Sequence, residues 1–186
     1  MPAFDLTNHF LIAMPTLADP NFVRTVTYIC AHNEEGAMGI VINRPLNLEL
    51  GEVLSQMDLK SDDPSVSARP VYHGGPVHTD RGFVIHRPAC EWNSTITVSA
   101  DVAVSTSRDI LEAISQGAGP TDSLVALGYA GWGAGQLEQE MAHNAWLSGP
   151  ASLDILFTTP AEQRWTRAAT LLGIDIGAIS HDVGHA

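Results

Sequence analysis

The chain has 186 residues, of which 45% are hydrophobic, 9 are lysine or arginine and 21 are aspartate or glutamate, so its formal net charge is −12. Such a charge repels the phosphates of nucleic acid and of anionic lipid, which argues against direct nucleic-acid binding. The apolar content is enough to fill one core, and we expect one domain over residues 1–186.

Two cysteines, Cys30 and Cys90, are present. A disulfide between them requires an oxidising compartment, but the N-terminus has no basic region and its apolar run Phe10–Met14 is too short for a secretion signal. We therefore expect a cytoplasmic protein with reduced thiols. No apolar window approaches the roughly 20 residues of a membrane helix, so we expect no membrane segment.

The first third of the chain carries strand signals. Apolar, β-branched and aromatic residues predict three strands, at Phe10–Met14, Arg24–His32 and Ala37–Asn43. Only a short turn separates the second from the third, which predicts an antiparallel hairpin. Alternation puts Val26, Tyr28 and Cys30 on one face, so Cys30 is expected to be a buried hydrophobe rather than a nucleophile. Gly39 predicts a bulge or a close backbone approach.

The middle of the chain mixes helix and strand signals. Apolar residues between Leu46 and Met57 recur at helical spacing, whereas the Ser, Asp and Pro content of Asp58–Pro70 predicts a solvated loop. Val71–Val77, interrupted by a Gly-Gly-Pro turn, and the following Gly82–Arg87 predict another hairpin-like unit. Two further short strands are expected, at Ile96–Ser99 and Val102–Val104.

A capping-box pattern follows these strands. Thr106 and Asp109 have the spacing that opens a helix, which we expect to run through Ser115 and to end at Gly117.

The most apolar strand signal is Leu124–Ala130, which we expect at the centre of the core. The glycines between 131 and 135 predict a tight turn, followed by a helix that packs Leu137 and Met141 inward and closes with Trp146.

The remaining signals complete the pattern. Leu153–Phe157 has the length of a strand, and Thr159-Pro160 with Glu162 predicts a helix start. Because strands occur in hairpin-like groups and also alternate with helices, the fold class is α+β with a mixed sheet.

Eight blocks in one order resemble the motifs of the YqgE/AlgH family. The blocks are Phe10–Pro15, Asp19–Phe22, Arg24–Val26, Gly36–Pro45, Gly74–Val77, Arg81–Phe83, Gly128–Trp132 and Gly135–Glu138. The resemblance spans nearly the whole chain. It implies a single α+β domain whose branched, largely antiparallel sheet folds into a pseudo-barrel with helices packed outside. It implies no particular activity, although one name of the family carries a transcriptional-regulator label.

Eight residues form the candidate ligand site, because all lie beside glycine or proline turns at strand ends, where loops can converge. They are Asn43, Arg44, His73, Gly74, Gly75, Arg81, Trp132 and Gln136. The two arginines can clamp a carboxylate or phosphate while turn N–H groups bind its other oxygens. The structural alternative is that Arg24, Arg44 and Arg81 pair with Asp19, Glu138 or Asp80, and the glycines supply only backbone dihedrals.

Metal and nucleophile signals are incomplete. Among eight histidines only His181 and His185 have helical i, i+4 spacing, and the chain ends one residue later. No serine lies in a Gly-x-Ser-x-Gly elbow, so no catalytic residue, metal or cofactor is assigned.

The sequence thus favours a binding or regulatory module for a protein partner or a small anionic ligand. Four tryptophans are candidate anchors for a protein partner: Trp92, Trp132, Trp146 and Trp165. The alternative is an enzyme that uses the arginine and glycine turns as an anion site.

Overall fold

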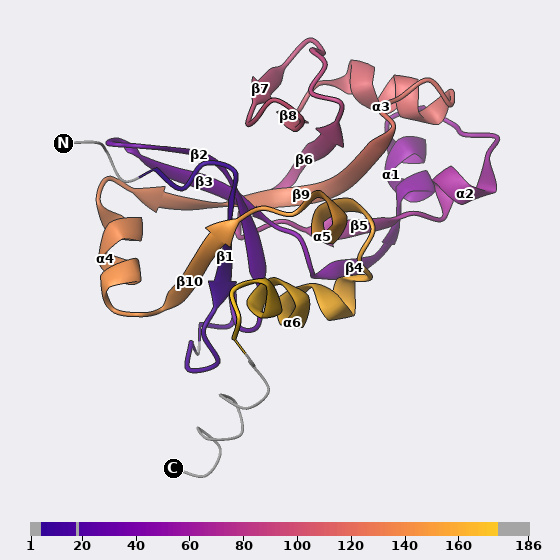
Figure 1. Cartoon of the computed structure of the whole chain (residues 1–186). Helices are drawn as coiled ribbons and strands as arrows, with labels where there is room; N and C mark the ends of the chain where they lie inside the picture. The colour runs from indigo at the N-terminus through magenta and orange to yellow at the C-terminus, as the bar shows by residue number, and fades with distance from the viewer. Residues whose placement is uncertain (1–4, 18, 175–186) are drawn as a thin grey trace.

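The computed structural model describes residues 5–17 and 19–174 (Figure 1). The strands in this part of the chain are β1 (His9–Ala13), β2 (Val26–Asn33), β3 (Gly36–Val41), β4 (Pro45–Glu49), β5 (Pro70–His73), β6 (Val77–Arg87), β7 (Thr95–Thr97), β8 (Ala103–Ser105), β9 (Asp122–Gly133) and β10 (Trp146–Pro150). The helices are α1 (Leu50–Gln56), α2 (Pro64–Ser67), α3 (Arg108–Ser115), α4 (Gln136–Ala142), α5 (Leu153–Phe157) and α6 (Ala161–Leu171).

The ten strands form one branched sheet. Eight of them follow the hydrogen-bonded order β10-β1-β2-β3-β9-β6-β8-β7, while β5 attaches to β9 and carries β4. Only the β5–β9 pairing is parallel among the described strands. The α+β class and the largely antiparallel branched sheet are confirmed, and the sheet curls into a half-barrel.

The branch lies on β9, which crosses the centre of the molecule in Figure 1. Ala126 pairs with Tyr72 of β5 on one edge and with Phe83 of β6 on the other. Beyond Gly128, β3 takes over the edge that β5 occupied, through pairs from Gly39↔Ala130 to Gly36↔Gly133. One strand therefore holds three neighbours together.

Three glycines make this branch sterically feasible. Gly74 donates its N–H to the Leu127 carbonyl over 2.8 Å, and its own carbonyl accepts from the Val41 N–H over 2.8 Å, so it joins β9 to the end of β3. A Cβ on Gly74 would overlap the Gly128 carbonyl oxygen, and a Cβ on Gly128 would overlap the Gly75 carbonyl oxygen. The backbones approach this closely only because no side chain stands between them.

Gly128 also shifts the alternation of side chains along β9. Leu124 and Ala126 belong to the central cluster, and the next residue packed against that cluster is Tyr129, three positions on. The φ of Gly128 is 81°, a value that L-residues rarely adopt. After the shift, Ala130 and Trp132 belong to a different cluster.

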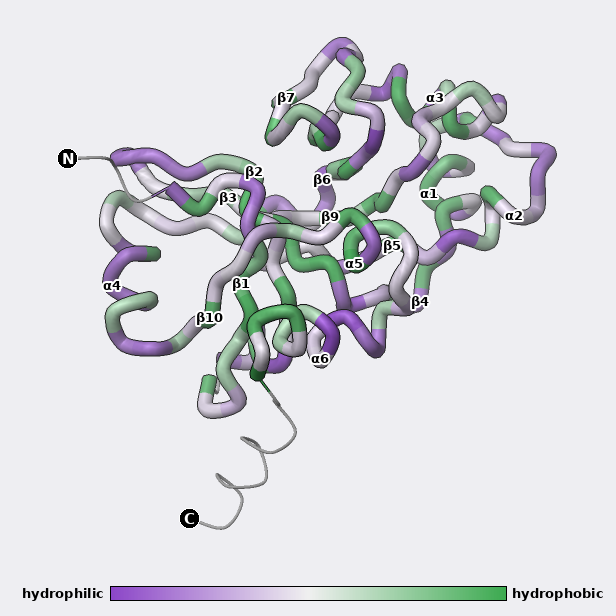
Figure 2. The backbone as a smooth tube through the Cα atoms, viewed as in Figure 1, coloured by the Kyte–Doolittle hydropathy of each residue, from purple (hydrophilic) through white to green (hydrophobic). Residues whose placement is uncertain are grey.

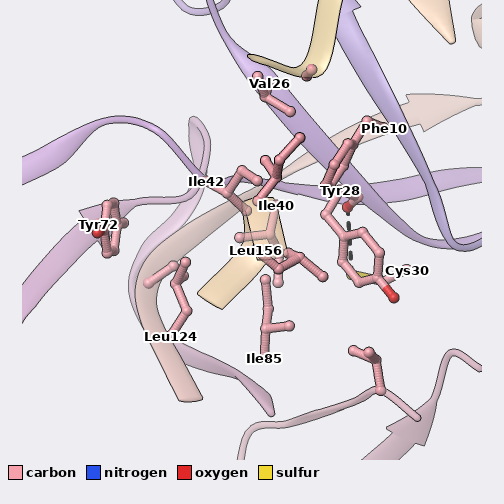
Figure 3. Packing of buried hydrophobic residues seen from close by; sticks show 14 of the residues in the cluster. Phe10, Val26, Tyr28, Cys30, Ile40, Ile42, Tyr72, Ile85, Leu124 and Leu156 are labelled. Atoms are coloured by element: carbon pink, nitrogen blue, oxygen red, sulfur yellow. Dashed lines mark hydrogen bonds between the residues drawn. The ribbon is translucent and has the colours of Figure 1, made fainter. Parts of the chain in front are cut away.

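Three apolar clusters stabilise the sheet. The central one joins β1, β2, β3 and β6 to helices α5 and α6, and Figure 3 shows part of it, with Phe10 and Tyr28 on one side and Tyr72 and Leu124 on the other. A second joins α1, α2 and α3 to β5, β6 and β9, and a third joins α4 to β1, β2 and β10. In Figure 2 the hydrophilic stretches lie at the periphery, notably at the tip of the β2–β3 hairpin and near α2.

The β2–β3 hairpin confirms the expectations for this region. Val26, Tyr28 and Cys30 all face the central cluster. The register shifts between Ile29 and Ala31, opposite Gly39, so the bulge lies on the partner strand. A Cβ on Gly39 would come within 2.7 Å of the Thr27 methyl carbon, which is the close approach expected there.

The predicted hairpin of residues 71–87 is wrong. β5 and β6 do not pair with each other in the described structure; both pair with β9, on opposite edges. Local turn chemistry cannot reveal this, because the Gly74-Gly75 turn carries the chain across β9 instead of folding it back.

Three predictions for the last third are also wrong. β9 continues to Gly133 instead of ending before the glycines, because backbone pairing with β3 outweighs the low strand propensity of glycine. Trp146 lies on β10, paired with Ala13, and not on the preceding helix. Leu153–Phe157 is helix α5, whose N-cap Ser152 accepts from the Ile155 N–H over 3.3 Å.

Helix boundaries differ from the expected ones by a few residues. The segment 46–57 divides into β4 and α1, and the expected loop 58–70 contains α2. Ser107, not Thr106, is the N-cap residue of α3, while Gly117 follows the end of the helix at a φ of 76° as expected. Pro160, not Thr159, is the N-cap of α6.

A substitution at the branch tests the glycine constraint. Gly128→Ala is expected to reduce the free energy of unfolding by about 3 kcal/mol or more, because the methyl group would overlap backbone that cannot move aside. Gly117→Ala is the matched control, since Gly117 has nearly the same φ but nothing within 4 Å of its Cβ position. It should cost only about 1 kcal/mol.

Urea denaturation measures both variants. Equal losses for Gly128→Ala and Gly117→Ala would contradict the close-approach explanation, because both share the cost of the φ value and differ only in the overlap.

Candidate functional site

Asn43 and Arg44 follow the end of β3, where their side chains bind the loop that precedes β2. The Asn43 amide accepts from the Val26 N–H and donates to the Arg24 carbonyl, each over 2.9 Å. Arg44 donates to the carbonyls of residues 20, 21 and 23 over 2.7 to 3.0 Å. Partial burial lowers the pKa of Arg44, while the Asp19 charge opposes that shift. The guanidinium is thus occupied by the 20–23 loop.

His73, Gly74 and Gly75 lie at the branch of the sheet. The His73 N–H donates to the Arg44 carbonyl over 2.8 Å, so its backbone continues the β4–β5 ladder. The N–H and carbonyl of Gly74 are both used by neighbouring strands. His73 and Gly74 therefore join strands through their backbone, and Gly75 lies against the backbone of Tyr129 and Ala130.

The carboxylate partners expected for the arginines are wrong. In the described residues, ion pairs within 4.0 Å are His32–Glu138, Arg87–Asp122 and Arg108–Glu112. The guanidinium carbon of Arg24 instead lies 4.6 Å from the Trp165 ring centroid. Glu138 binds His32 of β2, and the Leu6 N–H donates to His32 Nδ1, so the Nε2–H faces the carboxylate.

Trp132 and Gln136 meet at Glu140 of α4. Its carboxylate accepts from the indole N–H groups of Trp132 and Trp146 over 3.1 and 3.0 Å, and from the Gln136 amide over 2.9 Å. Gln136 also accepts from the Gly133 N–H over 3.0 Å, which closes the turn between β9 and α4. These polar groups therefore fix α4 on the sheet.

One open groove contains two of the eight predicted residues, Arg81 and Trp132. We call it the Arg81 groove; its volume is about 530 Å³ and its lining is Ala37, Met38, His78, Arg81, Phe83, Ser94, Ile96, Val104, Thr106, Tyr129, Gly131 and Trp132. None of the other six predicted residues belongs to its lining in the described structure. The structure thus separates Arg81 and Trp132 from the Arg44 and His73 region.

The lining of the Arg81 groove contains an aromatic cluster. The rings of Phe83 and Tyr129 meet edge to face at a centroid distance of 5.5 Å, and the His78 ring lies 5.9 Å from Tyr129. The guanidinium carbon of Arg81 lies 5.7 Å from the Phe83 centroid, a cation–π distance. Ile96 of β7, whose exposed fraction is 45%, forms part of the wall.

The sequence did not predict a buried series of hydrogen bonds that runs through His86, Ser105 and Thr95. His86 Nδ1 lies 3.0 Å from the Pro88 carbonyl, and its Nε2 lies 2.8 Å from Ser105 Oγ, which lies 2.9 Å from Thr95 Oγ1. The Pro88 carbonyl is an acceptor only, so Nδ1 carries the proton and the serine hydroxyl donates to Nε2. The side chains of His86 and Ser105 are fully buried, and this series of hydrogen bonds joins β6 to β8 and β7.

The remaining candidates have defined environments. Cys30 is completely buried, and burial raises the pKa of its thiol to about 12, which suppresses the thiolate. No cluster of three His, Cys, Asp or Glu residues suited to a metal occurs among residues 5–17 and 19–174. His181 and His185 lie outside the described residues. No helix in the described part is long and apolar enough to cross a bilayer.

Comparisons with known proteins agree along nearly the whole chain. The AlgH-like family model matches residues 10–177. A UPF0301 protein of Thioalkalivibrio sulfidiphilus is 63% identical over 182 residues, which is 98% of this chain and 97% of that protein. A UPF0301 protein of Nitrosococcus oceani is 55% identical over 179 residues, covering 96% of each chain.

Two solved structures share the architecture. The solution structure of the AlgH protein from Pseudomonas aeruginosa superposes with a TM-score of 0.81 at 50% identity, covering 97% of this chain and 95% of that chain. A crystal structure of a protein from Corynebacterium diphtheriae gives a TM-score of 0.77 at 18% identity, covering 97% and 94%. The second likeness concerns the fold alone.

The buried imidazole predicts a pH dependence of stability. Burial lowers the pKa of His86 below its ordinary value of 6.5, against an opposing hydrogen bond to Pro88. Because the folded pKa is the lower one, the unfolded chain takes up the proton first as the pH falls. The contribution of His86 to stability is therefore complete above pH 6.5 and is lost between that pH and the folded pKa.

Urea denaturation between about pH 7.5 and pH 5 measures this dependence. His86→Gln should show a smaller decrease of the unfolding free energy over that range than the unmodified protein. The exposed His143 provides the control, and His143→Gln should retain the full decrease. Identical pH profiles for the unmodified protein and His86→Gln would contradict the assignment.

Proposed function

This chain belongs to the AlgH-like family, and we propose that it acts as a binding module that recognises a protein partner through the Arg81 groove. One observation carries the proposal. The Arg81 guanidinium is exposed over the Phe83 ring, and no carboxylate of the described residues lies within 4.0 Å of it.

The composition of the groove favours a protein over a small polar metabolite. Arginine and aromatic residues dominate the binding energy of protein interfaces, and here Arg81, Tyr129 and Trp132 line one groove. The exposed Ile96 adds an apolar wall. A partner segment that places an apolar side chain over Tyr129 and a carboxylate at Arg81 fits this arrangement.

Charge also favours a defined contact at Arg81. The chain carries a net charge of −12, so an acidic partner is repelled over most of the surface. An arginine over the Phe83 ring, with no carboxylate of the described residues beside it, gives such a partner a place where its own carboxylate is attracted. A regulator that acts through protein contact needs this kind of selective docking point.

The enzyme alternative has weaker support. An anion clamp made by Arg44 and Arg81 together requires both guanidinium groups in one site. Arg44 is committed to the carbonyls of the 20–23 loop and is outside the lining of the Arg81 groove. The Ser105–His86 pair offers no accessible nucleophile, because both residues are fully buried.

Affinity capture with charge-reversal variants tests the proposal. The unmodified protein is expected to retain a stoichiometric partner from a lysate of the cells that produce it, and Arg81→Glu should weaken that binding about tenfold or more. Arg167→Glu is the control, since Arg167 is an exposed arginine of α6 outside the groove lining. Thermal melting checks that both variants remain folded.

Arrayed peptides that tile the captured partner then locate the contact. A binding peptide should contain an acidic residue near an apolar one. Replacement of that acid by its amide should reduce binding to the unmodified protein but not to Arg81→Glu. Equal capture by the unmodified protein and Arg81→Glu, or no retained partner at all, would sink the proposal.

A further inference from the structure

A second cavity lies at the opposite end of β9 from the Arg81 groove. Its volume is about 320 Å³, and it is bounded by the start of β9, by β5 and by helices α5 and α6. We call it the Arg164 cavity, after the arginine of α6 that lines it. Figure 3 labels three of its lining residues, Tyr72, Leu124 and Leu156, which also belong to the central cluster.

Arg164 is a buried charge without a counter-charge. Its exposed fraction is 5%, and no carboxylate in the described part of the chain lies within 4.0 Å of its guanidinium. Nε donates to the Thr159 carbonyl over 2.9 Å, Nη1 donates to the Ile42 carbonyl, and the guanidinium carbon lies 5.1 Å from the Tyr72 centroid. Nη2 has no hydrogen-bond partner among the described residues.

The guanidinium of Arg164 is suited to bind an anion. Burial of an unpaired ion is costly, and two carbonyls with an aromatic face compensate only part of the lost hydration. Arginine presents its donors as a fixed fork, so the remaining N–H groups on Nη2 suit the oxygens of a carboxylate or phosphate.

A second arginine lines the same cavity. Arg69 donates from Nη1 to Ser123 Oγ over 3.2 Å, which orients its side chain against the start of β9. The one carboxylate in the lining, Asp122, already pairs with Arg87 at 2.5 Å. The cavity therefore has an excess of positive charge in a chain whose net charge is strongly negative.

The remaining wall is apolar. Leu124 and Leu156 are almost completely buried beside Arg164, and Phe157 lines the cavity from α5. A volume of about 320 Å³ is at the lower limit of ligand cavities in proteins. The site thus matches a small ligand that has one charged end and one apolar end.

We propose that the Arg164 cavity binds a small organic oxyanion, whose carboxylate or phosphate contacts Arg164 and Arg69 and whose apolar part contacts Leu156 and Phe157. The site is independent of the Arg81 groove, because the two linings share no residue. The protein thereby gains a second binding activity, for a small anion instead of a protein segment.

Calorimetric titration with three probes tests the site: benzoate, phenyl phosphate and the neutral amide benzamide. At least one anion should bind with a dissociation constant of roughly millimolar or below, and benzamide should bind at least about tenfold more weakly. The stronger of the two anions identifies the ligand as a carboxylate or a phosphate.

Variants assign the binding to this cavity. Arg69→Gln is expected to weaken the anion about tenfold, because Arg69 is exposed and its removal should leave the fold intact. Arg167→Gln, an exposed arginine on the same helix as Arg164, is the control and should bind unchanged. Arg81→Gln should also bind unchanged, which separates this site from the proposed protein contact.

A spectroscopic readout avoids the risk that Arg164 substitutions unfold the chain. In the unmodified protein, the Nε–H resonance of Arg164 should shift on saturation with the anion, and that of Arg167 should not. The proposal is overturned if benzamide binds as tightly as the stronger of the two anions, if none of the three probes binds, or if Arg69→Gln leaves the anion binding unchanged.

Discussion

The close approach of the Gly74-Gly75 backbone to Gly128 is the constraint on which the sheet depends. β9 has hydrogen-bonding neighbours on both edges, and β5 and β3 share one of these edges in succession. The exchange between them occurs where a Cβ on any of the three glycines would overlap backbone. The α1–α3 cluster and the α4 cluster both pack against β9, so their relative position follows from this junction.

Local signals predicted the strands better than their partners. Residues 26–30 alternate clearly, and their strand and its hairpin were predictable because both depend on neighbouring residues. The pairing of β5 with β9 joins residues more than fifty positions apart, and no turn or propensity encodes it. Trp146 was misplaced for the same reason, since among the described residues its strand pairs with β1 alone. The branched sheet itself came from the family resemblance.

The candidate site was predictable only in part, because the sequence shows residue types but not the groups to which each side chain is hydrogen-bonded. Arg81 and Trp132 do line one groove, but Arg44 is used by backbone carbonyls that no pattern reveals. Arg164 had a readable signal: it falls on the apolar stripe of its helix beside Trp165 and Ala168. A charged residue at such a position is buried, and its charge then needs a compensating group. This requirement marks Arg164 as a candidate site residue from the sequence alone.

The central position of β9 has a consequence for the order in which the chain folds during synthesis. Gly36 pairs with Gly133, Tyr72 with Ala126 and Arg87 with Asp122. Three strands from the first half of the chain therefore cannot complete their pairing until β9 has been synthesised. Until residue 133 has left the ribosome, the β1–β3 and β6–β8 units have no strand to join them, and their edges stay open. Such a chain has a high contact order, and its nascent form needs protection from association through those edges.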